Sequence, residues 1–115
     1  MLMAPAVAVP VHAVQTTLPR RNAKNAHMIE QIMKCIRHHE SDTAGGYKAQ
    51  NSISTASGAY QYLDGTWRAF SHMAGYTHSP RHAKNAPPWM QDAVTRWALW
   101  NGHAKSWHGT WCPWT

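Results

Sequence analysis

One acidic residue stands where a carboxylic acid could take part in proton transfer. The chain has only five acidic residues, and one of them, Glu40, follows His38 and His39 at the end of a segment with helical patterning. At about 100° per residue, this acid continues the apolar stripe, whose members fall within about 80° of one another: Ile29, Ile32, Met33, Ile36 and Glu40. We therefore expect the carboxyl to face the interior, while His38 points nearly the opposite way and His39 lies on the flank with Cys35.

An inward-facing acid would suit general acid catalysis. Burial disfavours the ionised form of a carboxyl and raises its pKa. An acid that stays protonated near neutral pH can give its proton to a leaving oxygen. Helix ends are often irregular, so a second interpretation has Glu40 solvated at a frayed end or paired with Arg37. The stripe alone leaves both interpretations open and favours the second.

Three helices and a tail would position this residue. The pattern predicts a first helix over about residues 26–40 and a second that begins at Gly65–Thr66 with Asp64 as its N-cap. A third helix is expected between the prolines at 87–88 and the Asn-Gly pair at 101–102. Its predicted buried stripe consists of Met90, Ala93, Val94 and Trp97, with Leu99 on the opposite face.

The remaining segments point to a small, mainly α domain. The loop after Glu40 is rich in Ser, Gly, Thr and Asn, and Tyr60 and Tyr62 fit a short extended stretch before the second helix. We expect a leader or linker over residues 1–24 and one domain over residues 25–115, with at most a short β segment. The apolar start is shorter than the roughly 20 residues of a membrane span, so no span is expected.

Charge and cysteines limit the partners and the compartment. Eleven Lys and Arg against five Asp and Glu give a net charge of +6, which suits nucleic acid, an anionic membrane or an acidic wall polymer. Cys35 and Cys112 would form a disulfide in an exported protein and would stay reduced in the cytosol. None of the nine histidines completes a recognised metal-site spacing with the cysteines, so no metal and no cofactor are expected.

Several ordered motifs together resemble a known family. The segments "CIRHHES", "GGYKAQNSISTASGAYQYLDGTWRAF", "QDAVTRWALWNG" and "WCPW" resemble the lysozyme-like transglycosylase domain of actinobacterial resuscitation-promoting factors and related phage or secreted wall enzymes. The resemblance covers about residues 30–114. It implies a lysozyme-like α+β fold with a substrate cleft, acting outside the cell or in the cell wall.

The resemblance also implies roles for single residues. Glu40 matches the family's catalytic acid, and Cys35 and Cys112 match a disulfide that joins the first helix to the tail. The matching substrate-binding positions, two of them aromatic residues that could stack on sugar rings, are Asn51, Tyr60, Gln61, Thr66, Trp67 and Gln91. The turn after Glu40 is longer than the family's usual Glu-Ser-Gly-Gly-Asn turn, which leaves the geometry beside the acid open.

The implied substrate is peptidoglycan, cut between N-acetylmuramic acid and N-acetylglucosamine. A lytic transglycosylase needs one carboxyl because the 6-hydroxyl of the substrate closes a ring, whereas a muramidase would usually need a second. Asp42 is the only plausible second acid, although a loop carboxylate in water is the favoured interpretation for it. We expect a monomer that binds glycan strands, with anionic wall polymers as possible further partners.

Two other classes of function stay open. The same fold could serve as a non-catalytic wall-binding or virion structural module. A basic nucleic-acid-binding protein is less favoured, because the basic residues are scattered and no recognised nucleic-acid-binding module is present.

Overall fold

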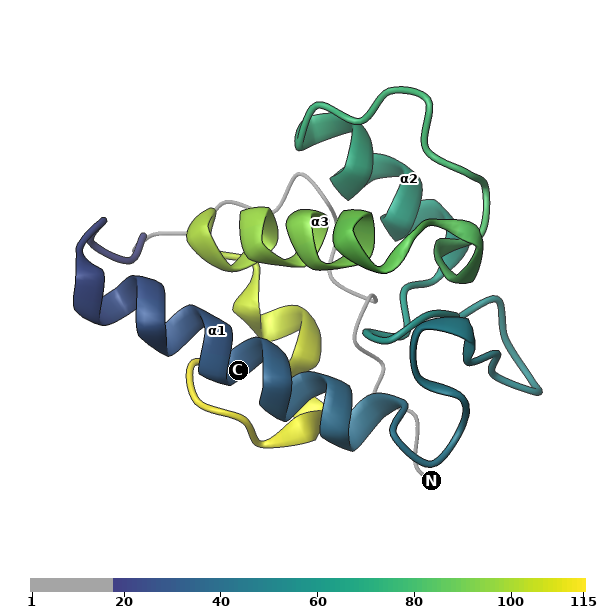
Figure 1. Cartoon of the computed structure of the whole chain (residues 1–115), viewed down its shortest axis with the longest axis horizontal. Helices are drawn as coiled ribbons and strands as arrows, with labels where there is room; N and C mark the ends of the chain where they lie inside the picture. Colours follow the sequence, from purple (N-terminus) through teal and green to yellow (C-terminus); the bar gives the residue numbers. More distant parts are fainter. Residues whose placement is uncertain (1–17) are drawn as a thin grey trace.

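The structure is a computed structural model that describes residues 18–115. Three α-helices form its frame: α1 (Ala23–Glu40), α2 (Asp64–Met73) and α3 (Pro88–Trp100). Three short 3-10 helices complete it: η1 (Gly46–Lys48), η2 (Ala83–Asn85) and η3 (Ala104–Thr110) (Figure 1). The leader expected over residues 1–24 lies mostly outside the described part of the chain.

Within residues 18–115 the fold is almost wholly helical. Extended pairing is limited there to the isolated bridges Gln50–Ser57 and Ser57–Tyr62. The expected mainly α domain is thereby confirmed. The short extended stretch around Tyr60 is wrong in detail, because Tyr60 lies in a tight turn that the Gln61 N–H closes on the Gly58 carbonyl.

The first helix forms as the sequence pattern predicts, with a longer first turn. The Asn22 side chain accepts a hydrogen bond from the Asn25 backbone N–H at 2.8 Å, so the helix begins three residues earlier than expected. Basic side chains in the last turn complement the negative end of the helix dipole. The predicted stripe is confirmed, since all five of its members are buried: Ile29, Ile32, Met33, Ile36 and Glu40.

The third helix has the predicted limits but a different buried face. It buries Gln91, Val94, Thr95, Ala98 and Leu99. Of the predicted stripe only Val94 is fully buried, and Leu99 lies on the buried face with it instead of opposite, so the predicted face was wrong in part. The difference arises because two polar side chains, Gln91 and Thr95, are buried on this face and form hydrogen bonds there. A search for an apolar stripe cannot detect buried polar residues. Asp64 also differs slightly, since it is the first residue of α2 and Leu63 is its N-cap.

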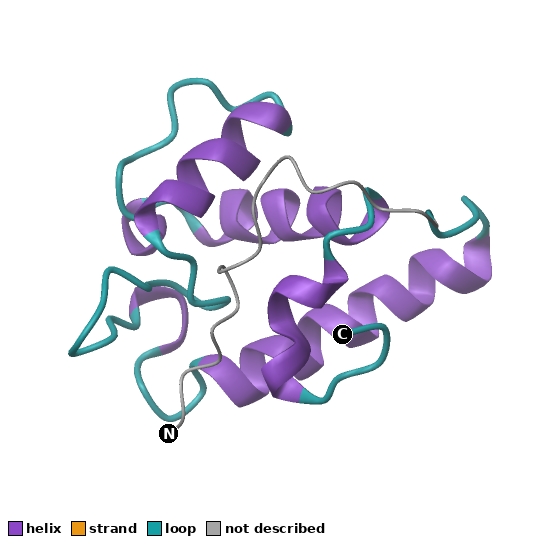
Figure 2. Ribbon diagram, turned by 180° about the vertical axis from the view of Figure 1, so that it is seen from behind, coloured by secondary structure: helices purple, strands orange, loops and turns teal. Residues whose placement is uncertain are grey.

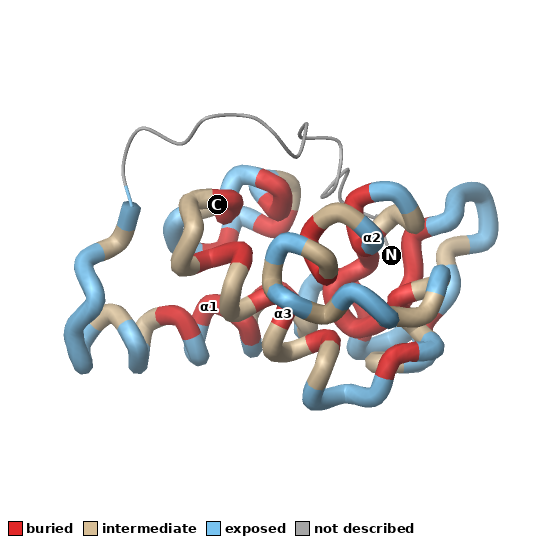
Figure 3. Tube along the Cα trace, turned by 90° about the horizontal axis from the view of Figure 1, so that it is seen from above, coloured by how far each residue is buried: buried red, intermediate tan, exposed pale blue. Residues whose placement is uncertain are grey.

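The core where these helices meet is aromatic. The Tyr62 ring lies 5.3 Å from Trp67, 6.1 Å from Phe70 and 5.6 Å from Trp107, between ring centroids. All four rings are fully buried. Buried segments gather where α3 and η3 pack against α1 and along residues 56–62, whereas the first turns of α1 are largely exposed (Figure 3).

The tail returns to the first helix and is fastened there. η3 packs against α1 (Figure 2), and a disulfide joins Cys35 to Cys112 across a sequence separation of 77 residues. This pairing matches the one that the family resemblance implied. In the described part of the chain, no helix combines the length and the apolar character that crossing a membrane requires.

Candidate functional site

Glu40 ends α1 with its side chain inside the protein. Its exposed fraction is 0%, so the inward-facing interpretation holds and the solvated, frayed end does not. Hydrogen bonds on both sides fasten this turn to the loop of residues 57–62. Ser41 Oγ donates to the Ala59 carbonyl at 2.8 Å, and Arg37 Nη1 donates to the Tyr60 hydroxyl at 2.7 Å. The acid is therefore held beside this loop by its neighbours in sequence.

The loop of residues 57–62 is itself fixed by the side chain of Gln91. The Ala59 N–H donates to Gln91 Oε1 at 2.9 Å, and Gln91 Nε2 donates to the carbonyls of Tyr47 and Ala86. Gly58 has φ 82°, and a Cβ atom there would lie 2.5 Å from Gln91 Oε1. Only glycine fits this position, because a side chain would meet both the amide and an unfavourable backbone conformation.

Gln61 combines full burial with a strained backbone conformation. It is fully buried and adopts φ 54°, a conformation that costs free energy for a residue other than glycine. Its Nε2 donates to the Gly58 carbonyl at 2.9 Å. Its Oε1 is buried and accepts no hydrogen bond from residues 18–115.

Thr66 is largely buried at the start of α2, and a role for it in sugar binding stays a prediction. It is in the first turn of α2 and is 8% exposed. The first turn of a helix offers backbone N–H groups that have no partner within the helix.

Two expected substrate contacts belong to the core instead. The rings of Tyr60 and Trp67 are both fully buried, so neither presents a face on which a sugar could stack. Trp67 Nε1 donates to the Pro80 carbonyl at 2.8 Å, and Trp107 Nε1 donates to the Tyr60 carbonyl at 3.0 Å. These bonds place both aromatic residues in the scaffold of the domain.

Asp92 organises a cluster that the sequence did not reveal. Its Oδ1 accepts hydrogen bonds from the hydroxyls of Tyr60 at 2.6 Å and Tyr47 at 2.8 Å, and it lies 3.8 Å from Arg37 Nη1. Burial first, and then the bond to Asp92, raise the pKa of both tyrosines. The cluster ties α1, the loop and α3 together. The only sequence signal was an acid on a polar helix face, which does not identify its partners.

The remaining predicted residues lie in the long loop after α1. Asp42 is exposed, and its carboxylate is 2.9 Å from His38 Nδ1, which fits the solvated-loop interpretation of this acid. Asn51 is half-buried, and its Oδ1 accepts from the Ile53 N–H at 2.8 Å. The Asn51 side chain thus stabilises a local turn in the loop.

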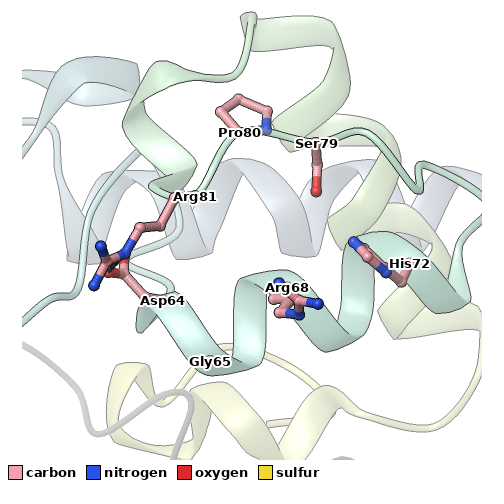
Figure 4. A pocket seen from close by; sticks show the side chains of 7 residues that line it. All are labelled: Asp64, Gly65, Arg68, His72, Ser79, Pro80 and Arg81. Carbon is pink, nitrogen blue, oxygen red and sulfur yellow. Dashed lines mark ion pairs between the residues drawn. The ribbon is translucent and has the colours of Figure 1, made fainter.

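A pocket of about 350 Å³ opens on the outer side of α2 (Figure 4). It is lined by Asp64, Gly65, Arg68, His72, Ser79, Pro80 and Arg81. Asp64 is already engaged there, at 2.9 Å from His82 Nδ1 and 3.7 Å from Arg81 Nε. Glu40, Gln61 and Thr66 are not among the lining residues, so the groove expected beside Glu40 remains a prediction.

The chain was compared with known proteins at the levels of family, sequence and structure. No protein-family model, no curated protein and no solved structure matches it.

Proposed function

We propose that this chain is a peptidoglycan-cleaving glycosidase of the lytic transglycosylase kind, with Glu40 as its general acid and base. One observation carries the proposal: a carboxylic acid at the end of α1 has no exposed surface and is fastened beside the loop that contains Gln61. General acid catalysis needs a carboxyl that carries its proton, and the proposal assigns that form to Glu40. The motif resemblance supplies the substrate class.

The other four acids of the chain favour a mechanism with one carboxyl. Asp92 accepts from two tyrosines, Asp64 lies against His82 and Arg81, and Asp42 lies against His38 in the solvent. Glu30 forms a two-point ion pair with Arg96 on the outside of α1. Each is occupied with structural partners, and none is as buried as Glu40. A hydrolase that needs a second carboxyl to activate water is therefore the less favoured alternative.

This mechanism needs one carboxyl that acts first as a general acid and then as a general base. The Glu40 carboxyl gives its proton to the oxygen that leaves C1 of N-acetylmuramic acid, and the sugar passes through an oxocarbenium-like state. The resulting carboxylate takes the proton from the 6-hydroxyl of the same sugar as that oxygen attacks C1. The product is a 1,6-anhydro end, and Glu40 regains its starting protonation state without a water molecule entering the product.

The test is release of soluble muropeptides from purified peptidoglycan by the full chain. We expect anhydro ends by mass spectrometry, and a loss of about 10²-fold or more in rate for Glu40→Gln, since general acid catalysis contributes that much. Asp42→Asn is the matched control, and its rate should stay near that of the unchanged chain. Glu40→Gln that is folded by circular dichroism and still active would refute the role of Glu40. Reducing ends would point to hydrolysis.

A non-catalytic wall-binding module is the second candidate. It is favoured by the burial of Tyr60, Trp67 and Gln91, because these motif side chains contribute to the scaffold whether or not catalysis occurs. This alternative predicts that the chain sediments with peptidoglycan, that it releases nothing, and that Glu40→Gln binds as well as the unchanged chain.

A further inference from the structure

Three side chains of metal-ligating type meet where the tail crosses the end of α1. Cys35 and His39 are four residues apart on α1 and so share a face of the helix. Cys112 arrives from the tail, 77 residues after Cys35 in the sequence. The two sulfur atoms and a ring nitrogen of His39 all lie within 4.8 Å of one another. The sequence did not reveal this group because its third member is so distant along the chain.

We propose that Cys35, His39 and Cys112 form a zinc site when the disulfide is reduced. Zinc accepts thiolate sulfur at about 2.3 Å and imidazole nitrogen at about 2.0–2.1 Å, in a tetrahedron. Ligand atoms at those distances are separated by roughly 3.5–3.8 Å, so His39 needs only a small adjustment. The two Cα atoms of the cysteines are 6.0 Å apart. Once the bond between the sulfurs is broken, rotation of the side chains can separate them to the required distance.

The surroundings of the three ligands agree with a site at the protein surface. Cys112 is buried, Cys35 is half-buried and His39 is exposed, so the fourth coordination position would face the solvent and take a water molecule. His38 is not part of this group, because its Nδ1 lies 2.9 Å from the Asp42 carboxylate. Its ring contacts His39 only edge-on, at 5.2 Å between centroids.

The exchange is chemically balanced. A dithiol gives two electrons and two protons to the Cys35–Cys112 disulfide and becomes a disulfide itself, which leaves two thiols on the protein. Zinc then displaces the two thiol protons to the solvent, and His39 binds as neutral imidazole. Two thiolates neutralise the charge of the ion. The covalent bond and the metal thus fasten the same two elements, α1 and the tail, in oxidising and in reducing surroundings.

Cobalt(II) is the probe, because it takes zinc's place and absorbs light when thiolates bind it. The full chain is reduced with a phosphine, titrated with cobalt(II) and then with zinc. We expect a thiolate-to-cobalt charge-transfer band and the visible bands of tetrahedral cobalt, both removed by zinc. The oxidised chain should show neither band. Helix content is followed by circular dichroism in the same samples.

Variants identify the ligands. His39→Gln should weaken cobalt binding by more than the roughly tenfold loss that removing an outer-shell partner causes. His38→Gln, the matched control on the same helical turn, should bind as the unchanged chain does. A Cys35→Ser, Cys112→Ser double variant should lose the charge-transfer band.

Three results would overturn the proposal. The first is a reduced, folded chain that gives no charge-transfer band. The second is a His39→Gln variant with unchanged spectrum and affinity. The third concerns a chain that unfolds on reduction. Zinc should restore the helix signal of that chain, and an unrestored signal would contradict the site. The assay does not involve peptidoglycan, so its outcome is independent of the glycosidase proposal.

Discussion

At the scale of single residues, Gln91 shows how a polar side chain can hold a candidate site together. Its amide joins three loops through one accepted and two donated hydrogen bonds, and it is 1% exposed. Gln91→Ala would leave a backbone N–H and two carbonyls without these partners in the interior. We expect the free energy of unfolding to fall by about 3 kcal/mol, measured by urea denaturation.

Gln50 supplies the matched control for that substitution. Its Nε2 also donates to three backbone carbonyls, but it is exposed and all three acceptors lie within its own loop. Water can replace these bonds, so Gln50→Ala should cost less than about 1 kcal/mol. Equal losses in the two variants would show that burial is not what makes Gln91 important.

His103 gives the fold a dependence on pH. The residue is 7% exposed, and its ring stacks on Trp97 at 5.4 Å between centroids. Burial lowers the pKa of this histidine below its usual 6.5. The unfolded chain therefore binds more protons than the folded one as the pH falls below about 6.5, and the free energy of unfolding falls with it. His103→Phe keeps a ring in place and should reduce this slope between pH 7.5 and 5.5.

The exposed His108 is the control for the pH experiment. His108→Gln should keep the slope of the unchanged chain in the same range of pH. If His103→Phe kept that slope as well, another group would have to be responsible for it.

At the scale of elements, the sequence predicted those helix limits and buried positions that a repeat of apolar residues marks. The end of α1 and both limits of α3 follow from periodicity and from end signals such as Asn101 and Gly102, and the buried position of Glu40 follows from the stripe that it extends. The start of α1 was placed three residues too late, because the cap at Asn22 was not recognised. The face of α3 was missed because Gln91 and Thr95 are buried through hydrogen bonds. Long-range partners such as Tyr60 with Asp92 were missed because no local pattern encodes them.

Among the contacts between elements, we expect the Cys35–Cys112 disulfide to contribute most to the free energy of unfolding. A bond that closes a loop of this length removes much of the conformational entropy of the unfolded chain, worth about 4 kcal/mol in the chain-entropy model. Reduction in the presence of a metal chelator should therefore lower the free energy of unfolding by about that amount. Urea denaturation with and without reductant measures it.

A variant that lacks both cysteines controls for side effects of the reductant. Cys35→Ser together with Cys112→Ser should unfold at the same urea concentration with or without reductant, near that of the reduced chain. An unchanged midpoint on reducing the original chain would mean that packing of η3 against α1 is sufficient without the bond.

At the scale of the whole molecule, charge governs the approach to a partner. A net charge of +6 on a chain of 115 residues attracts anionic polymers over distances set by the salt concentration. The screening length is about 10 Å at 0.1 M salt and about 3 Å at 1 M. If acidic wall polymers concentrate the protein at its substrate, binding to whole cell walls should weaken strongly between these two salt concentrations.

Co-sedimentation with two surfaces separates this attraction from recognition of the sugar. Intact walls carry anionic polymers, whereas chitin is an uncharged polymer of N-acetylglucosamine. We expect binding to intact walls to fall with salt and any binding to chitin to stay constant, because only the first interaction is screened. Wall binding that persists unchanged at about 1 M salt would instead assign the affinity to contacts with the glycan. The positive surface would then have no part in bringing the protein to the wall.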